Sequence, residues 1–223
     1  MASENVVMSQ GSTAAAVSEQ LSDLITEGRL APGSRVSDAA LALRLKVSRN
    51  TVREAFRLLA HDGLLVHEFN RGVFVPFVTS EDVRDVYRLR RVIEPQVVRA
   101  LTPADTHRLG RLRQAVLDAE AVSSEEDWPR VGTANMHFHR ALVALANSPR
   151  LDLTMRRLMA EQRLAFAVMD DPRPLYEPFV GRNKALLGLL GEARFEEGAN
   201  FLESYLADSE GRILAACERR DSA

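Results

Sequence analysis

The hydrophobic and polar positions between residues 47 and 64 follow the three- and four-residue spacing of a helix that is buried on one side. The apolar stripe consists of Val52, Ala55, Phe56 and Leu59. Ser48 stands just before this stripe, and serine is one of the preferred N-cap residues of helices. The pattern predicts a helix that begins after Ser48 and packs its apolar stripe against a core.

The opposite face of this predicted helix is basic. From Arg44 to Arg57 the chain has five basic side chains and one acidic side chain, Glu54. Arginine, asparagine, serine and threonine in the first turns of a helix can bind phosphates and hydrogen-bond to base edges. We therefore interpret the segment as a DNA-recognition helix. The predicted DNA contacts on it are Ser48, Arg49, Asn50, Thr51 and Arg53.

Two further elements flank the basic helix. A short helix beginning at Ser37 precedes it, separated from it by a break at 46–47, as in a helix-turn-helix. Two β-prone runs follow it, and Asn70, Arg71 and Gly72 between them favour a hairpin turn. Helix, helix and hairpin in this order predict a winged helix-turn-helix, whose wing tip at Arg71 can enter a minor groove. The alternative interpretation is a basic surface helix beside an unrelated hairpin.

Beyond residue 80 the pattern is helical throughout, without a strand pattern or a repeat. We place helices near 80–101, bent at Pro95, and near 103–122, 127–146, 150–169, 178–190 and 193–219. The predicted fold class is mainly α: an N-terminal winged helix-turn-helix followed by an all-α antiparallel bundle of about six helices. The predicted boundaries are 1–12 for a disordered arm, 13–77 for the winged helix-turn-helix, 78–81 for a linker and 82–219 for the bundle.

Composition and charge restrict the function. The chain has 223 residues, 46% of them hydrophobic, which suffices for one large or two small domains. Its net charge of −2 is no signature of a nucleic-acid-binding protein, so DNA affinity has to come from the local basic cluster. We expect a cytoplasmic protein without a membrane partner, because no apolar run could span a bilayer, no signal segment is visible and the single cysteine is Cys217. No nucleophilic or phosphate-binding motif is visible, so we expect no enzymatic activity.

A set of motifs runs through the N-terminal part of the chain. They are Leu30 to Gly33, Ser37 and Asp38, Leu41 and Ala42, Val47 to Arg49, Val52 to Ala55, Leu58 and Leu59, Asp62 to Leu64, Arg71 and Gly72, and Phe74 and Val75. Together they resemble the GntR family of bacterial transcriptional regulators. The resemblance implies DNA contacts at Ser48, Arg49, Thr51 and Arg53, and at Arg71 and Gly72 of the wing. Ala39 departs from the family, which often has a polar or basic contact residue there.

Three motifs of the helical part point to one branch of that family. They are Tyr87 to Glu94, Asn135 with Phe138 to Leu142, and Asn147 to Pro149. With the helical pattern they resemble the FadR-like (FCD) subfamily, in its shorter, six-helix form. The resemblance implies a bundle whose cavity binds a small organic acid, commonly beside a divalent metal held by one aspartate and three histidines.

The metal-binding positions of that subfamily carry other residues here. The aspartate position falls on Asn135, the first histidine is retained as His139, and the other two fall on Asn183 and Tyr205. One imidazole, two neutral amides and a phenol are a poor ligand set for zinc, nickel or manganese, so we expect no metal cofactor. His137 cannot replace a ligand, because it lies two positions from His139 and points away from it on a helix. The alternative is a weak site completed by the carboxylate of the effector.

The same positions can form a site without a metal. Asn135, His139, Asn183 and Tyr205 lie on helix faces otherwise lined by apolar side chains, and Arg90 occupies the arginine position of the subfamily's Arg-x-x-x-Glu pair. We interpret these five residues as an effector-binding site. The alternatives are a buried hydrogen-bonded network without a ligand and, for Arg90, an ion pair that only stabilises its own helix.

The sequence therefore predicts a ligand-responsive transcriptional regulator, which in this family is most often a repressor. A homodimer would place two winged helices on a palindromic DNA operator, since two-fold symmetry requires matching half-sites. A small organic acid in the bundle would act through the linker at 76–81. One competing hypothesis is a metal-dependent sensor or small helical metalloenzyme that uses His137 and His139. Another keeps DNA binding but treats the bundle as a dimerisation module without an effector.

Overall fold

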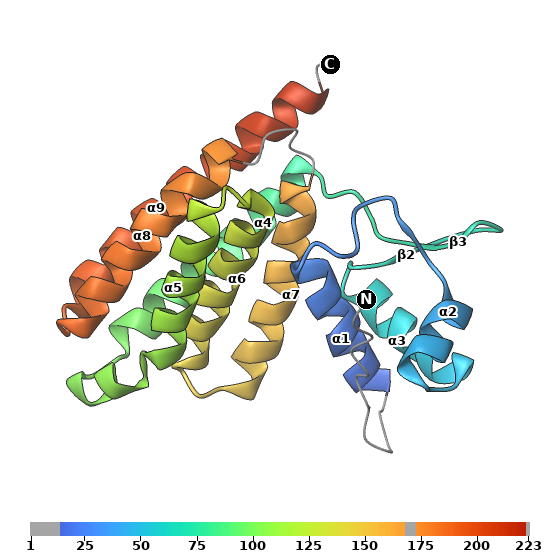
Figure 1. The fold of residues 1–223 in the computed structure, drawn as a ribbon, viewed down its shortest axis with the longest axis horizontal. Coiled ribbons are helices and arrows are strands. Elements are labelled where there is room, and N and C mark those ends of the chain that lie inside the picture. The colour runs from blue at the N-terminus through green and yellow to red at the C-terminus, as the bar shows by residue number, and fades with distance from the viewer. Residues whose placement is uncertain (1–13, 168–172, 222–223) are drawn as a thin grey trace.

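The computed structural model describes residues 14–167 and 173–221 and has a small N-terminal part beside a larger helical part (Figure 1). The N-terminal part contains α1 (Ala14–Thr26), β1 (Arg35–Val36), α2 (Asp38–Leu45), α3 (Arg49–His61), β2 (Val66–Glu68) and β3 (Gly72–Phe74). The helical part contains α4 (Ser80–Arg99), the 3-10 helix η1 (Pro103–Arg108), α5 (Gly110–Ser124), α6 (Trp128–Ala144), α7 (Pro149–Phe166), α8 (Arg173–Gly191) and α9 (Phe195–Asp221). The arm predicted at 1–12 lies outside the described residues.

The N-terminal part is a winged helix-turn-helix, as predicted. Lys46, with a φ of 53°, ends α2 and lets the chain turn into α3. The predicted apolar stripe of α3 is buried, and α3 packs against α1. The hairpin of β2 and β3 forms the wing and is joined by β1 in an antiparallel sheet of order β1-β3-β2. The pattern of the sequence did not indicate β1, because a strand of two residues has no periodicity to detect.

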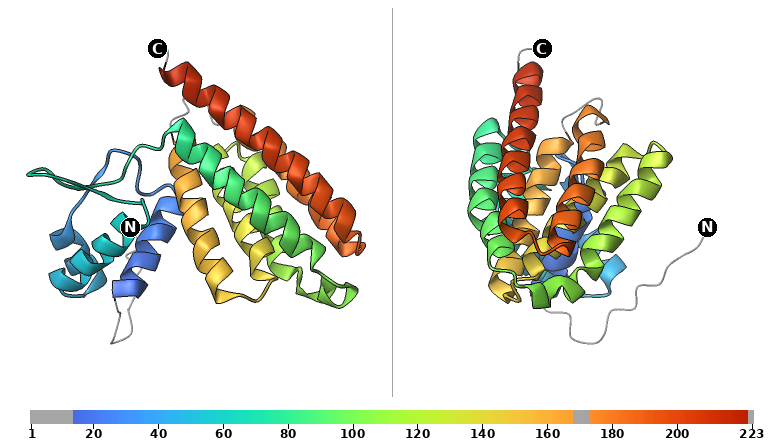
Figure 2. Two further views of the ribbon diagram at one scale, coloured as in Figure 1. Left: turned by 180° about the vertical axis from the view of Figure 1, so that it is seen from behind. Right: turned by 90° about the vertical axis from the view of Figure 1, so that its left-hand side faces the viewer.

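The helical part is a bundle with α6 near its centre, where it contacts α4, α5, α7 and α8. The long helix α9 runs along α4 on one side, as Figure 2 shows, and also packs against α8. Phe138 and Leu142 of α6, Met159 of α7 and Leu202 of α9 are fully buried in its core. The predicted helical bundle is therefore confirmed.

The first helix of the bundle has a defined start, and two predicted helix boundaries are corrected. The N-cap of α4 is Thr79, because Thr79 and Asp82 form a reciprocal capping box. The helix predicted at 103–122 is divided into η1 and α5. α8 begins at Arg173 rather than at residue 178 and continues through Pro178. Pro178 lacks the N–H that would serve the carbonyl of Pro174, and Arg212 donates to that oxygen instead, at 3.5 Å.

α1 joins the two parts, because it packs against α7 as well as α3 (Figure 1). Asp23 of α1 accepts hydrogen bonds from Arg140 at 2.9 Å and from Arg156 at 3.4 Å. Just after α1, Gly28 has a φ of 73° and lies so close to Arg163 that a Cβ at this position would overlap the guanidinium group. Among the described residues, no helix is both long and apolar enough to cross a membrane.

Candidate functional site

The basic face of α3 begins at a well-defined cap. The Ser48 side chain accepts a hydrogen bond from the backbone N–H of Thr51 at 3.0 Å, and the two hydroxyl oxygens lie 2.8 Å apart. Asn50 is exposed in the first turn. Arg49 and Arg53 are one turn apart on the same face, and the side chain of each is 60% exposed. The structure thus brings the five predicted DNA contacts of α3 together on one accessible surface.

A carboxylate stands between the two exposed arginines. Asp38 Oδ2 accepts a hydrogen bond from Arg53 Nε at 2.8 Å, and Asp38 Oδ1 accepts one from Arg49 Nη2 at 3.1 Å. Asp38 is the first residue of α2, so these contacts connect the two helices of the helix-turn-helix. Sequence analysis identified Asp38 only as part of a family motif, because contacts over 11 and 15 residues leave no local pattern.

The wing presents its two predicted residues next to this surface. Arg71 forms an ion pair with Glu68, and its guanidinium carbon lies 5.4 Å from the centre of the Phe74 ring. Gly72 has a φ of 114°, and its Cα faces the guanidinium of Arg35. A groove of about 650 Å³ separates the wing from α3. Its polar lining includes Arg35, Asp38, Arg53, Arg57 and His67.

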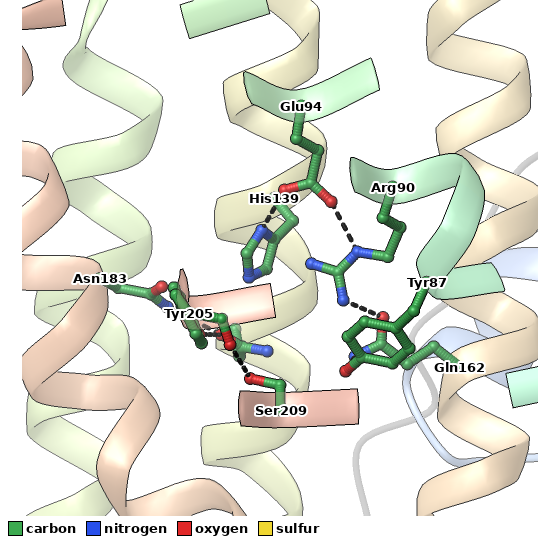
Figure 3. Close-up of polar contacts among 9 residues, drawn as sticks. Tyr87, Arg90, Glu94, His139, Gln162, Asn183, Tyr205 and Ser209 are labelled. Atoms are coloured by element: carbon green, nitrogen blue, oxygen red, sulfur yellow. Dashed lines mark hydrogen bonds and ion pairs between the residues drawn. The ribbon is translucent and has the colours of Figure 1, made fainter. Parts of the chain in front are cut away.

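Inside the bundle, a cluster of polar side chains is centred on Arg90 of α4 (Figure 3). Arg90 Nε donates to Glu94 Oε1 at 2.5 Å, and Glu94 Oε2 accepts a hydrogen bond from Nδ1 of His139 at 2.6 Å. In the other direction, Arg90 Nη1 donates to Gln162 Oε1 at 2.5 Å, and Gln162 Nε2 donates to the Tyr87 hydroxyl at 3.2 Å. The cluster therefore joins helices α4, α6 and α7.

A second group of polar side chains lies beside His139. Asn135 Oδ1 accepts hydrogen bonds from Asn183 Nδ2 at 2.8 Å and from the Tyr205 hydroxyl at 2.9 Å. The rings of His139 and Tyr205 lie 5.5 Å apart between centroids, which places the two groups in contact. The five residues predicted as the effector site are Arg90, Asn135, His139, Asn183 and Tyr205; each is at most 3% exposed, and the fold brings them together.

Burial and charge set the protonation of the cluster. Burial would raise the pKa of Glu94, but the neighbouring Arg90 and His139 outweigh it and lower this pKa to about 2. Burial lowers the pKa of His139, and the Glu94 carboxylate opposes that shift only in part. Burial also raises the pKa of Tyr205 well above 10. At neutral pH the cluster thus holds one anion, one cation, a neutral imidazole that donates to Glu94 and the neutral phenols of Tyr87 and Tyr205.

Two of the buried polar atoms that have no hydrogen-bond partner in the described part of the chain belong to this cluster. They are Nη2 of Arg90 and Oδ1 of Asn183. A buried donor or acceptor without a partner costs about 1–3 kcal/mol. Figure 3 shows the Arg90 guanidinium pointing toward His139. One unpaired donor and one unpaired acceptor at this cluster are the features expected of a site for a small polar ligand.

The cluster does not fit a divalent metal. His139 Nδ1 is bound to Glu94, so the residue offers only Nε2. Asn135 Oδ1, the oxygen at the family's aspartate position, already accepts two hydrogen bonds. No group of three or more His, Cys, Asp or Glu side chains suited to a metal occurs among the described residues. His137 lies on the outer surface of the bundle, where it lines a groove between α5, α6 and α7, while His139 is buried.

Sequence reasoning missed part of this cluster. Tyr87 begins one of the FCD motifs but received no role, and Gln162 was not identified. Gln162 is 72 residues from Arg90 and 75 from Tyr87 in the sequence. The only signal is a polar residue on an otherwise apolar face of α7, one turn from Met159 and Phe166.

The fold and the basic recognition helix define a DNA-binding transcriptional regulator. The chain belongs to the GntR family of bacterial regulatory proteins, whose model matches residues 13–75, and residues 85–207 match the FCD domain. The chain is therefore a regulator with an FCD domain and not an enzyme.

Individual proteins agree with this assignment. The crystal structure of a GntR transcriptional regulator from Rhodococcus sp. RHA1 matches this structure with a TM-score of 0.80. The two sequences are 42% identical, and the match covers 91% of this chain and 98% of that one. The Nta operon transcriptional regulator of Aminobacter aminovorans is 28% identical over 82% of this chain and 86% of its own length. The HTH-type transcriptional regulator YdhC of Bacillus subtilis is 31% identical, and the match spans 59% of this chain and 60% of that protein.

Proposed function

We propose that this regulator acts as a homodimer that binds a palindromic operator, represses transcription from it and responds to a small organic acid held in the bundle. Two copies related by a two-fold axis would place two α3 helices on matching half-sites. The observation that carries the DNA-binding proposal is the pair Arg49 and Arg53, exposed on one face of α3 beside the wing.

The operator can be identified by selection from random DNA. Full-length protein is used to select sequences from a random pool of duplexes, and the complex is weighed by light scattering. The proposal predicts an inverted repeat bound by two protein chains. Enrichment of a single unrepeated site, bound by one chain, would contradict the homodimer proposal.

The effector proposal is supported by the two unpaired buried atoms. A carboxylate can accept from Arg90 Nη2, and a hydroxyl or N–H group of the same ligand can donate to Asn183 Oδ1. Charge balance would couple effector binding to protonation of His139. Glu94 already neutralises Arg90, so a bound carboxylate adds a net negative charge that protonation of His139 at Nε2 would cancel. We therefore expect effector acids to bind more tightly as the pH falls from about 7.5 toward about 6, the range in which histidine titrates.

A direct test uses a panel of small monocarboxylic and hydroxy acids in thermal-shift measurements on the wild type and on Arg90→Met. A stabilising acid whose effect disappears in Arg90→Met would support the site, and native mass spectrometry would show its adduct. If Arg90→Met folds and every acid affects both proteins alike, the cluster is a buried network and the bundle serves dimerisation only.

A further inference from the structure

A negatively charged side chain in the middle of a DNA-binding surface is unexpected, because it repels the phosphates that the surface has to approach. Asp38 lies there, with a side chain that is only 21% exposed, between Arg49 and Arg53. Both arginines are predicted DNA contacts, and Asp38 is the only acid that pairs with them among the described residues. The position of this carboxylate therefore requires an explanation beyond the net charge of the surface.

The contacts leave the outer edge of one arginine available for DNA. Asp38 binds Arg53 through Nε, and within the described residues the two terminal nitrogens of Arg53 have no protein partner. These two nitrogens can donate together to O6 and N7 of a guanine. Asp38 binds Arg49 through Nη2 only, which leaves its Nε and Nη1 for a base or a phosphate. The carboxylate thus holds each guanidinium by one side without covering its remaining donors.

Asp38 is itself held firmly. Ser37 caps α2 by accepting a hydrogen bond from the backbone N–H of Ala40 at 3.3 Å, which fixes the backbone at the start of this helix. The hydrogen bond from Arg53 lowers the pKa of Asp38, and Arg49 adds to this shift against the effect of burial. The residue therefore stays ionised at every pH at which DNA binding is measured.

We propose that Asp38 is a positioning residue that fixes Arg49 and Arg53 for base contact and lowers their affinity for phosphates of random DNA. A free arginine loses side-chain entropy when it binds a base, and an arginine already held by a carboxylate loses less of it on binding. The same carboxylate adds one negative charge, which weakens non-specific binding. Asp38 would thus increase the ratio between operator and random DNA affinity. This inference rests on the proposal that α3 is the recognition helix.

The test measures the affinity of full-length variants for the selected operator and for a random duplex of equal length. Asp38→Asn should bind the operator about 3- to 10-fold more weakly, because it loses the two exposed ion pairs that position the arginines. It should bind random DNA about twofold more tightly, because one repulsive charge is gone. Asp38→Glu retains the charge and should recover part of the operator affinity. In an Arg53→Ala background, Asp38→Asn should cost less than it does in the wild type.

Glu54→Gln is the matched control, because it removes one negative charge from α3 itself. Glu54 pairs with Arg57 and does not contact the two arginines that Asp38 holds. This variant should tighten operator and random DNA alike. Melting temperatures of all variants show whether an effect is only a loss of folding.

Each remaining outcome overturns a defined statement. If Asp38→Asn increases the affinity for both DNAs, as expected of Glu54→Gln, Asp38 only repels DNA. If it weakens both DNAs and lowers the melting temperature, Asp38 has a structural role. If a new selection changes the preferred base at a single position, Asp38 reads that base directly. If Arg49→Ala and Arg53→Ala leave operator affinity unchanged, the recognition-helix proposal fails, and the positioning inference fails with it.

Discussion

Gln162 of α7 accepts a hydrogen bond of 2.5 Å from Arg90 of α4 in the interior of the bundle. The neighbouring residue on α7, Arg163, packs against Gly28 just after α1, and Arg156 of the same helix pairs with Asp23 of α1. One helix therefore contacts both the buried polar cluster and the DNA-binding part. Packed helices move as rigid units. A change in the Arg90 contacts on ligand binding would therefore reach α1 through α7, as well as through the linker at 76–81.

Replacement of Gln162 by leucine tests the first link of this connection. The change leaves Arg90 Nη1 and the Tyr87 hydroxyl without their partner in the interior, so we expect a loss of about 1–3 kcal/mol in the free energy of unfolding. Urea denaturation measures it. Gln114→Leu is the control, because Gln114 is exposed and bonds only to Asp118 on its own helix. Equal, small effects of both variants would show that the buried bonds contribute little.

Glu94→Gln should lower the free energy of unfolding more than Gln162→Leu does. Glu94 is the only anion that faces Arg90 among the described residues of the cluster, and both side chains are at most 1% exposed. The variant leaves a buried guanidinium without a counter-charge, which costs about 3–5 kcal/mol. Urea denaturation at neutral pH gives the value. Glu203→Gln, which breaks the exposed pair with Arg99, should change stability little, and a similarly small effect of Glu94→Gln would contradict the assigned ion pair.

Arg53→Ala should weaken specific DNA binding by about 1–3 kcal/mol while the protein stays folded. The side chain lies outside the core, so the melting temperature and the proposed homodimer should be unaffected. Fluorescence anisotropy with the selected operator measures the affinity. Arg88→Ala removes the same charge from an exposed position of α4, outside the winged helix-turn-helix, and serves as the control. Unchanged operator affinity in both Arg49→Ala and Arg53→Ala would refute the recognition-helix assignment.

The pKa of His139 predicts a pH dependence of stability. Its pKa in the folded protein is lowered below 6.5, so the unfolded chain binds this proton more readily. The free energy of unfolding should therefore fall as the pH falls below about 6.5, by at most about 1.4 kcal/mol per pH unit for one proton. His139→Asn cannot titrate, and its amide can still donate to Glu94, so it should show a smaller slope between about pH 7.5 and about pH 5.5.

His137 is the internal comparison for this measurement. Partial burial and the nearby Arg140 lower its pKa as well, so His137→Asn should also reduce the slope. The reductions in slope caused by the two single variants should add in the double variant, since the residues lie on different sides of α6. A slope that His139→Asn leaves unchanged would show that the imidazole is not the titrating group.

The sequence predicted what local patterns encode. The stripe of α3, the cap at Ser48 and the turn at Asn70 are set by neighbours within four residues, and all three appear in the structure. The contacts of Asp38 and Gln162 depend on how separate helices pack, which no spacing along the chain specifies. The convergence of the five residues predicted as an effector site followed from the family resemblance, because their positions are spread over four helices.

The metal-binding positions of the FCD subfamily carry other side chains in this protein. Asn135, Asn183 and Tyr205 converge beside His139, and Glu94 orients that histidine through Nδ1, as outer-shell carboxylates orient metal-binding histidines. A chelator should leave the melting temperature and operator affinity of the wild type unchanged, because the present donor set holds no divalent cation tightly. The triple variant Asn135→Asp, Asn183→His and Tyr205→His should be stabilised by added zinc or nickel, since binding to the folded state alone raises the melting temperature. Adding His139→Ala to this variant should abolish the metal response. A large drop in the wild-type melting temperature on chelation would show that these residues do hold a metal. A triple variant that folds without any metal response would show that the four side chains do not adopt a common coordination geometry.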